Sequence, residues 1–321
     1  MTTIVTGGLG FIGSHTVRAF AEAREQVVAT SYESTRVPTF LEPYVGRNVT
    51  IERCDLDEPG AIEAVARKHG ADGIVHLALH RRASTDPGED VRINMDKLSH
   101  LFDGARAAGV KRFCWGSNGA MFAELPEGPF HEETPVLLTG RVQPGAFKKA
   151  WEVLVHNYAN NYAATADMEV VSMRISGVFG PTYRSMLNLP SRLCHAASRG
   201  HEPDFSERFG GVPFAGDNFD ITYALDVAGA IRTLQLAPSL AHTVYNIGRA
   251  ETVTAADLLD AVRAARPGFD ADLQEGRSAR YRPNACLDNE RITNETGWRP
   301  AWTIPAAIAD YIAWLDSGQE F

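Results

Sequence analysis

The chain has 321 residues and a formal net charge of −9, with 44% hydrophobic and 22% charged residues. A chain of this length can bury a full hydrophobic core without disulfides or structural metals. The negative charge and the lack of a block of lysine and arginine argue against nucleic acid or an anionic membrane as a partner. A phosphorylated small-molecule substrate stays possible, because single arginines can bind an anion inside an acidic protein.

The cysteines lie far apart in the sequence, at Cys54, Cys114, Cys194 and Cys286. Because they form no CxxC pair, they predict neither a metal site nor a redox pair. Free, buried thiols are typical of a reducing compartment. The sequence shows no secretory signal and no apolar run of membrane-spanning length. We therefore expect a cytoplasmic protein with no membrane partner.

The first part of the chain alternates short apolar runs with helical patterns. Strands are expected at residues 3–6, 26–30, 49–53, 73–77, 112–115 and 170–174. Helices are expected at residues 13–23, 61–69, 93–108 and 147–164. Strands that alternate with helices form a parallel sheet covered on both faces. The prediction is an α/β fold, a Rossmann-type doubly wound parallel sheet with a smaller C-terminal substrate-binding region.

The pattern becomes irregular after residue 174. It predicts a helix at 190–199, a strand and helix within 220–237, a strand at 244–247 and a terminal helix within 277–321. Thr254 followed by Asp257 resembles a capping box at the start of another helix. The predicted NAD(P)-binding domain spans 1–175 plus about 218–250, and the predicted substrate-binding region spans about 176–217 plus 251–321.

A glycine-rich turn joins the first strand to the first helix. Its sequence places Phe11 and Ile12 between the last two glycines of a GxxGxxG pattern formed by Gly7, Gly10 and Gly13. The first glycine permits a sharp turn, the second lets the backbone approach a pyrophosphate, and the third allows close helix packing. A helix N-terminus then offers N–H groups to the phosphates. The turn predicts NAD or NADP as cofactor.

The end of the second strand usually selects between the two cofactors. It carries Ser31, which lacks the carboxylate that would reject a 2′-phosphate, and Arg36 follows close enough to meet one. This favours NADP. Glu33 could hold the ribose hydroxyls instead, and Arg36 could be only a solvated loop charge, so NAD stays open.

Several further segments narrow the choice among dinucleotide-binding proteins. They are Asp55-Leu56, His76-Leu77-Ala78, Asn94, Arg174 with Val178-Phe179-Gly180-Pro181, Asp226-Val227-Ala228, Tyr245-Asn246-Ile247-Gly248 and Gly297-Trp298-Arg299-Pro300. Together they resemble the extended short-chain dehydrogenase/reductase family of sugar-nucleotide epimerases and dehydratases, over essentially the whole chain. The resemblance implies that Asp55 and Leu56 meet the adenine, that Leu77 and Ala78 border the nicotinamide phosphates, and that Asn94 contributes to the cofactor site.

The resemblance also implies a Ser or Thr, a Tyr and a Lys as the catalytic set. Lys148 takes the Lys place, because Glu152 follows four residues later as in the family motif. The Tyr place, four residues before the Lys, holds Pro144, and no tyrosine occurs between residues 44 and 158. The Ser place falls on Asn118, with Ser117 beside it, and either side chain could hydrogen-bond a substrate oxygen.

A replacement proton carrier is needed, because a positioned acid or base contributes roughly 10²–10⁴-fold to the rate. His80 and Tyr183 are the candidates, since both follow the carboxyl ends of strands; Arg141 would act only by its charge. On the substrate side, Gly177 and Phe219 stand where the family has an Asn and an Arg near the diphosphate. Five arginines remain as possible anion contacts: Arg184, Arg192, Arg208, Arg280 and Arg282.

These observations favour an NAD(P)-dependent oxidoreductase or epimerase/dehydratase-like enzyme acting on a sugar-like or small hydroxy/carbonyl substrate. The alternatives are a non-redox isomerase or lyase that uses the dinucleotide structurally, and an inactive nucleotide-binding protein. The resemblance further implies a homodimer through helices 93–108 and 147–164. Apolar positions that could serve that interface, or pack on the sheet, are Leu98, Leu101, Phe102, Trp151, Val155 and Tyr158.

Overall fold

The computed structural model describes residues 1–321 except 33–35, 79–85, 139–142, 162–166, 209 and 319–321. The chain divides into two compact units. The first comprises Met1–Ala123, Val136–Arg174 and Ala228–Tyr245, and the second comprises Glu124–Pro135, Ile175–Val227 and Asn246–Phe321. The assignment of a cofactor-binding and a substrate-binding domain stays a prediction, since compactness alone does not define a function.

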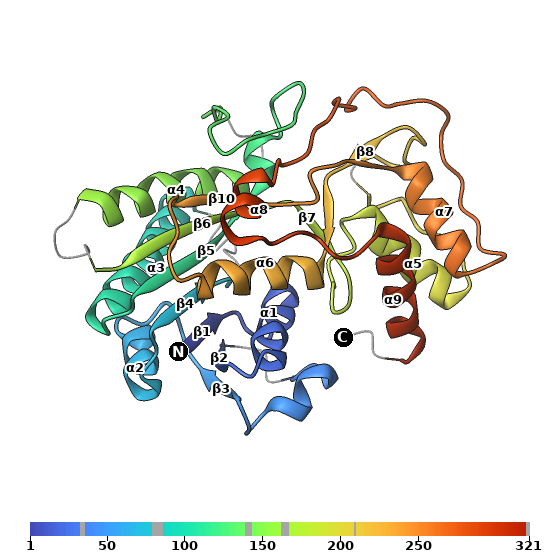
Figure 1. Ribbon diagram of the computed structural model, residues 1–321. Coiled ribbons are helices and arrows are strands. Elements are labelled where there is room, and N and C mark those ends of the chain that lie inside the picture. The colour runs from blue at the N-terminus through green and yellow to red at the C-terminus, as the bar shows by residue number, and fades with distance from the viewer. Residues whose placement is uncertain (33–35, 79–85, 139–142, 162–166, 209, 319–321) are drawn as a thin grey trace. The chain divides into compact units, whose positions relative to one another are not determined.

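A seven-stranded sheet runs through the described part of the first unit (Figure 1). Its order is β10-β6-β5-β4-β1-β2-β3, and the registers between β1 and β2, β1 and β4, β2 and β3, and β4 and β5 are parallel. The strands are β1 (Thr2–Thr6), β2 (Gln26–Ser31), β3 (Val49–Arg53), β4 (Gly73–His76), β5 (Arg112–Asn118), β6 (Glu169–Ile175) and β10 (Val244–Ile247). The order 3-2-1-4-5-6 is that of the Rossmann fold, which confirms the predicted class.

The helices of the first unit are α1 (Phe11–Glu22), α2 (Ala61–His69), α3 (Pro87–Ala107), α4 (Gln143–Asn161) and α6 (Ala224–Leu236), the last of which begins in the second unit. α3 begins six residues before its predicted start. Asp86 caps it by accepting a hydrogen bond from the Glu89 backbone nitrogen at 2.7 Å, and Pro87 fits the first helical position because its missing N–H would have no partner there.

One face of the sheet is covered by α2, α3 and α4. Ile4, Ile74 and Phe113 of the strands pack in one core cluster with side chains of these helices. α6 covers the opposite face, where Gln235 lies against Gly73 and Thr3 (Figure 1). All the apolar positions considered for a dimer interface belong to the first cluster: Leu98, Leu101, Phe102, Trp151 and Val155 are buried in it, and Tyr158 packs against it. Their apolar spacing is therefore used for packing within the chain.

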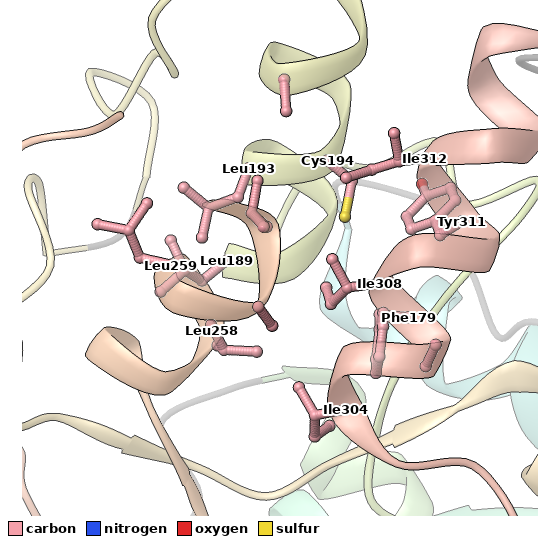
Figure 2. Close-up of a cluster of buried hydrophobic side chains, with 14 of the residues drawn as sticks. Phe179, Leu189, Leu193, Cys194, Leu258, Leu259, Ile304, Ile308, Tyr311 and Ile312 are labelled. Carbon is pink, nitrogen blue, oxygen red and sulfur yellow. The ribbon is translucent and has the colours of Figure 1, made fainter. Parts of the chain in front are cut away.

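The second unit has a helical core. It contains α5 (Leu189–Arg199), α7 (Ala255–Ala265), α8 (Glu290–Thr296) and α9 (Ile304–Asp316). Figure 2 shows Leu193 and Cys194 of α5, Leu258 and Leu259 of α7, and Ile308 and Tyr311 of α9 pointing into one buried cluster. The predicted capping box is confirmed, because Thr254 and Asp257 exchange side-chain to backbone hydrogen bonds at the start of α7.

Two short strand pairs complete the second unit. β7 (Gly177–Phe179) runs parallel to β9 (Ile221–Tyr223), and β8 (Asn218–Phe219) runs antiparallel to β11 (Val253–Thr254). The strands β7, β8 and β11 were not expected, because two- and three-residue strands carry too few positions to show an apolar alternation. The short helix α8 was not expected either. Two 3₁₀ helices also occur in the chain, η1 (Thr39–Tyr44) and η2 (Gly119–Phe122).

The four cysteines are free and buried, as predicted. Within the described ranges, no helix combines the length and the apolar character needed to cross a bilayer.

Candidate functional site

The glycine turn has no room for side chains at two of its three glycines. Gly7 has a φ of +65°, and a Cβ there would lie 2.9 Å from the Cα of Ala78. A Cβ on Gly13 would lie 2.1 Å from the carbonyl oxygen of Gly7, which is far inside van der Waals contact. The turn and the close packing expected of these glycines are therefore present.

Gly10 is less crowded than the other two glycines. A Cβ there would meet only the Gly7 carbonyl oxygen within 4 Å, at 3.1 Å. Gly10 is the N-cap of α1 and supplies no side-chain cap, and the Ser14 nitrogen donates to its carbonyl at 2.8 Å. The backbone N–H groups of the first helical turn have no intrahelical acceptor. The half-buried Phe11 and Ile12 belong to that turn, and the whole cradle fits a pyrophosphate.

The end of β2 brings together residues that are separated in the sequence. Ser31 is its last residue and pairs with Arg53 at the end of β3. The Arg53 guanidinium carbon lies 5.1 Å from the centroid of the Tyr32 ring. Arg36 is exposed, and Glu33 lies outside the described residues. Arg53 was missed by the sequence analysis, although the expected parallel pairing of the two strands could have placed it beside Ser31.

The predicted adenine contacts follow β3. The Asp55 carboxylate accepts a hydrogen bond from the Asp57 backbone nitrogen at 3.0 Å, which holds the turn. Leu56 is half-buried and packs against the core of the first unit. Both residues are therefore fixed at the carboxyl edge of the sheet, and their role toward an adenine stays a prediction.

Thr6 joins the ends of β1 and β4. Its Oγ1 lies 2.7 Å from His76 Nδ1 and accepts from the backbone nitrogens of Leu77 and Ala78 at 3.2 and 3.3 Å. This places the backbone of Ala78 directly against Gly7. Two segments that the sequence analysis assigned to cofactor binding therefore meet in the structure.

Asn94 is fully buried in α3. Its Nδ2 donates to the carbonyl oxygen of Asp90 at 2.7 Å, while its Oδ1 has no hydrogen-bond partner among the described residues. A buried acceptor without a donor is costly, so this oxygen keeps the capacity to accept a further hydrogen bond.

Ser117 belongs to a buried hydrogen-bond network. Its hydroxyl donates to Glu152 Oε2 at 2.8 Å, and the other Glu152 oxygen accepts from Arg174, whose Nε lies 2.9 Å away. All three side chains are buried. Ser117 therefore positions the end of β5 against α4, and its proton is already engaged.

Asn118 is the better placed of the two candidates for the Ser role. It ends β5 and is half-buried. Its Oδ1 accepts from the Ala120 backbone nitrogen at 2.7 Å, while its amide nitrogen makes no hydrogen bond within the described part of the chain. The amide can therefore donate to a ligand. The predicted strand ended at Trp115; the three further residues of β5 carry this position to the sheet edge.

Lys148 lies on α4 with its ammonium group in an aromatic setting. The group donates to the carbonyl oxygen of Gly116 and lies 5.0 Å from the Trp115 ring centroid and 5.8 Å from that of Trp151. Burial lowers the pKa of Lys148 to about 8. The indole faces favour the cation, whereas the desolvation that lowers this pKa favours the neutral amine.

His76 completes this group. Its ring stacks on Trp151 at 6.0 Å, and its Nε2 has no hydrogen-bond partner among the described residues. Burial, followed by the charge of Lys148, lowers the pKa of His76 to about 3. The imidazole is therefore neutral at physiological pH. In the sequence, His76 stands out only as part of a motif, Trp151 only as an apolar position of a helix, and Trp115 only as the end of a predicted strand.

The remaining catalytic candidates are not brought together by the described structure. His80 and Arg141 lie outside the described residues, and Pro144 lies in the first turn of α4, where no side-chain position is described. Tyr183 is half-buried in the second unit, between β7 and α5, and its backbone nitrogen donates to Gly180 at 3.3 Å. The roles of His80 and Tyr183 stay predictions.

Two positions of the second unit explain the departures from the family pattern. A Cβ on Gly177 would lie 2.8 Å from the Asp220 carbonyl oxygen, so β7 and β9 pair too closely for a larger residue. Phe219 packs against the core of the second unit. Asp220 follows it, with Oδ2 accepting from the Leu287 nitrogen at 3.0 Å, and burial raises the pKa of Asp220 to about 7.

Within the described ranges, no group of three or more His, Cys, Asp or Glu side chains could hold a metal ion. The described residues bring together a glycine turn at a helix N-terminus, a lysine, an amide donor and a neutral imidazole.

Comparisons with known proteins agree with this arrangement. The profile of the NAD dependent epimerase/dehydratase family matches residues 3–248. A dTDP-glucose 4,6-dehydratase of Actinoplanes sp. is 28% identical, with 100% of this chain and 99% of the relative aligned. A UDP-glucose 4-epimerase of Erwinia amylovora is 25% identical, with 98% and 97% aligned.

Solved structures show the same fold. The UDP-glucose 4-epimerase of Thermotoga maritima superposes with a TM-score of 0.79 at 21% identity, covering 99% of each chain. That of Thermus thermophilus, solved in complex with NAD, gives 0.77 at 24% identity and covers 98% of each chain. Because the family profile covers most of the chain and the relatives align along nearly all of it, the chain belongs to the NAD-dependent epimerase/dehydratase family, of the extended short-chain dehydrogenase/reductase type.

Proposed function

We propose that the protein is an NAD(P)-dependent epimerase, dehydratase or related oxidoreductase that acts on a sugar-nucleotide-like substrate. The observation that carries the proposal is the cradle of Gly7, Gly10 and Gly13, in which packing excludes side chains at two glycines and leaves the third, at the N-terminus of α1, less crowded. The names of the relatives, dTDP-glucose 4,6-dehydratase and UDP-glucose 4-epimerase, support the substrate class.

The cradle would hold the pyrophosphate of the dinucleotide, and Lys148 would lie beside its ribose. When bound, a nicotinamide cofactor accepts or donates a hydride. In our proposal the Asn118 amide donates a hydrogen bond to the substrate oxygen, which orients that oxygen. Ser117 acts as a positioning residue, because its hydroxyl already donates to Glu152.

The proton carrier is non-standard in this proposal, since proline at 144 has no proton to exchange. His80 and Tyr183 were the sequence candidates. The described residues give support to a third, the Lys148 amine, whose pKa is lowered to about 8 by burial. An amine with that pKa can take a proton from a substrate hydroxyl and return it near neutral pH.

NADP remains the favoured cofactor from Ser31 and Arg36, and Arg53 beside Ser31 adds a second cation at the same edge. The Thermus thermophilus and Bacillus anthracis structures with this fold are complexes with NAD, which supports the alternative. The setting proposed is cytoplasmic, in keeping with four free, buried cysteines.

A homodimer is also proposed, through different side chains from those first considered. α3 and α4 expose Val91, Val153 and Leu154, with relative exposures of 49%, 67% and 42%. Exposed aliphatic side chains on two such helices suit a twofold interface. A monomeric mass by light scattering at micromolar concentration would refute it.

Thermal unfolding with NAD⁺, NADH, NADP⁺ and NADPH tests the central proposal. A ligand at 100 times its Kd adds about 2.7 kcal/mol to stability, so one pair should raise the midpoint by a few degrees. A substrate screen with UDP-glucose and dTDP-glucose, followed by nicotinamide absorbance, then tests turnover. Binding without turnover of any substrate would support the inactive nucleotide-binding alternative, and no binding of any dinucleotide would end the proposal.

A further inference from the structure

The indole ring of Trp115 is held by a hydrogen bond at its edge. Trp115 lies on β5 and is buried, and its Nε1 donates to Oγ of Ser172 on β6 at 2.6 Å. An indole N–H can only donate, so the serine oxygen is the acceptor. A buried donor that loses its acceptor is costly. The bond to Ser172 therefore fixes the orientation of the Trp115 ring.

Ser172 also meets His156 of α4. Its Oγ lies 2.8 Å from His156 Nε2, and either the hydroxyl or the imidazole can supply the proton of this second bond. The backbone nitrogen of Ser172 donates to the carbonyl oxygen of Thr243 at 2.8 Å. Ser172 is fully buried. The serine is thus held by its backbone and by two side chains.

These bonds close a path that begins and ends on α4. Lys148 of this helix lies with its ammonium group 5.0 Å from the Trp115 ring centroid. The path continues from Trp115 to Ser172 and from there to His156, about two helical turns after Lys148. All four residues belong to the first unit. A rotation of the Trp115 ring away from Lys148 would therefore break the bond to Ser172.

Burial, and with it the access of water, controls the Lys148 amine, because burial is what lowers its pKa to about 8. The titratable and charged side chains around it are His76 on β4, Glu152 on α4 and Arg174 on β6. His76 is neutral, because its pKa is lowered to about 3, and Glu152 and Arg174 form a buried ion pair. Burial also lowers the pKa of His156, on which Glu152 and Arg174 act in opposite directions.

We propose that Ser172 is a positioning residue for Lys148: through Trp115, and supported by His156, it holds the indole face against the ammonium group and keeps water away from it. The inference rests on the proposed function, in which the Lys148 amine carries the proton. An indole N–H without its acceptor turns toward water, and water then enters beside the ammonium group. Ser172 touches no reacting group and acts only through Trp115.

Nuclear magnetic resonance of the full-length protein with ¹³C-dimethylated lysines tests the inference. The lysines of the chain are Lys68, Lys97, Lys111, Lys148 and Lys149. Lys148→Arg assigns the Lys148 signal by its absence. In Ser172→Ala the pKa of Lys148 should rise by about one unit, from about 8 toward 10.5, because water relieves the desolvation. Ser172→Cys keeps a weak acceptor of similar size and should give a smaller rise.

Ser176→Ala is the matched control. It also removes a buried serine hydroxyl, but one whose partners are the Gly177 carbonyl oxygen and the Thr222 hydroxyl. The pKa of Lys148 should be the same in this variant as in the parent. The indole N–H resonance of Trp115 should shift in Ser172→Ala and stay in place in Ser176→Ala. If Ser172→Ala does not fold, Ser172→Cys carries the test.

An unchanged or lowered Lys148 pKa in the folded Ser172 variants would overturn the inference. Dinucleotide titrations and the substrate screen separate it from the proposed function. If no dinucleotide binds while the Lys148 pKa still depends on Ser172, the proposed function fails and the positioning of Lys148 stands. If a substrate turns over, the pH at which kcat reaches half its maximum should move in Ser172→Ala together with the Lys148 pKa. A midpoint that stays in place would remove Ser172 from the reaction.

Discussion

The glycine turn and the edge formed by β5 and α4 differ in what holds them. At the turn, backbone atoms pack directly against backbone atoms, so a Cβ on Gly13 would lie 2.1 Å from the Gly7 carbonyl oxygen. At the β5–α4 edge, side chains meet side chains: Ser117 donates to Glu152, which accepts from Arg174. The turn can therefore accept few substitutions. At the β5–α4 edge, a side chain can be replaced if the side chains that contact it are replaced as well.

This difference explains why the first region keeps the family pattern and the second departs from it. The turn uses only properties of glycine, which no other residue supplies. In the proposed function the edge of β5 and α4 needs a proton carrier, which several side chains can supply when burial adjusts their pKa. Here Pro144 stands in the place that the family resemblance gives to the Tyr, and Lys148 lies against two tryptophans with a lowered pKa.

The largest expected effect on stability is at the edge formed by β5 and α4. Glu152→Ala leaves the buried Arg174 guanidinium without its carboxylate, and breaking a buried pair costs about 3–5 kcal/mol. Glu152→Gln, which can still accept from Arg174, should cost less. Urea unfolding measures both, and a Glu152→Ala loss below about 1 kcal/mol would contradict the network.

The glycine turn should separate stability from binding. Gly13→Ala forces backbone atoms apart and should cost about 1–3 kcal/mol of unfolding free energy. In Gly10→Ala the new Cβ would lie 3.1 Å from a single atom, the Gly7 carbonyl oxygen, so this substitution should cost less stability than Gly13→Ala, while the added methyl group weakens dinucleotide binding. The pair is compared by thermal unfolding and by NADH or NADPH titration. Undiminished dinucleotide affinity in Gly10→Ala would remove that glycine from the phosphate site.

Lys148 should make stability depend on pH in a defined window. Its pKa is about 8 in the folded protein against 10.5 as the ordinary value. Between these values the unfolded chain holds a proton that the folded chain has lost, so the unfolding free energy rises with pH. Below pH 8 both states are protonated and the cost of the buried charge is fully present.

The unfolding free energy of the parent, relative to that of Lys148→Met, should therefore rise by roughly 1–2 kcal/mol from pH 7.5 to pH 9.5. This rise is less than the full shift implies, because the side chain is only half-buried. Urea unfolding of both proteins across this range gives the difference. A flat difference would place the Lys148 pKa near its ordinary value and remove the support for this amine as the proton carrier.

The smallest expected effect concerns cofactor choice. Ser31→Asp should lower NADPH affinity about tenfold relative to NADH, because a carboxylate repels the 2′-phosphate. Arg53→Ala and Arg36→Ala should each lower only NADPH affinity, by a few-fold, since both side chains are exposed. If the parent prefers NADH and neither arginine matters, the choice is made elsewhere.

The sequence by itself determined the Rossmann half. The strands β3 and β10 and the helix α2 have the predicted bounds, because apolar periodicity and flanking glycines are local properties of the chain. The glycine turn could be predicted for the same reason: its geometry depends on residues within one short segment. Free, buried cysteines and the capping box at Thr254 and Asp257 follow the same logic.

Only the tertiary structure decided which partners each side chain of the candidate site meets. Ser117 and Asn118 are adjacent in sequence and could not be separated, yet one is bound to Glu152 of α4 and the other keeps its amide nitrogen available. The apolar positions of α3 and α4 fit a dimer or a core equally well until their packing on the sheet is seen. The hydrogen bond from Trp115 to Ser172 joins residues that lie 57 positions apart in the sequence. Such contacts depend on how elements pack, and packing is not a property of any one segment.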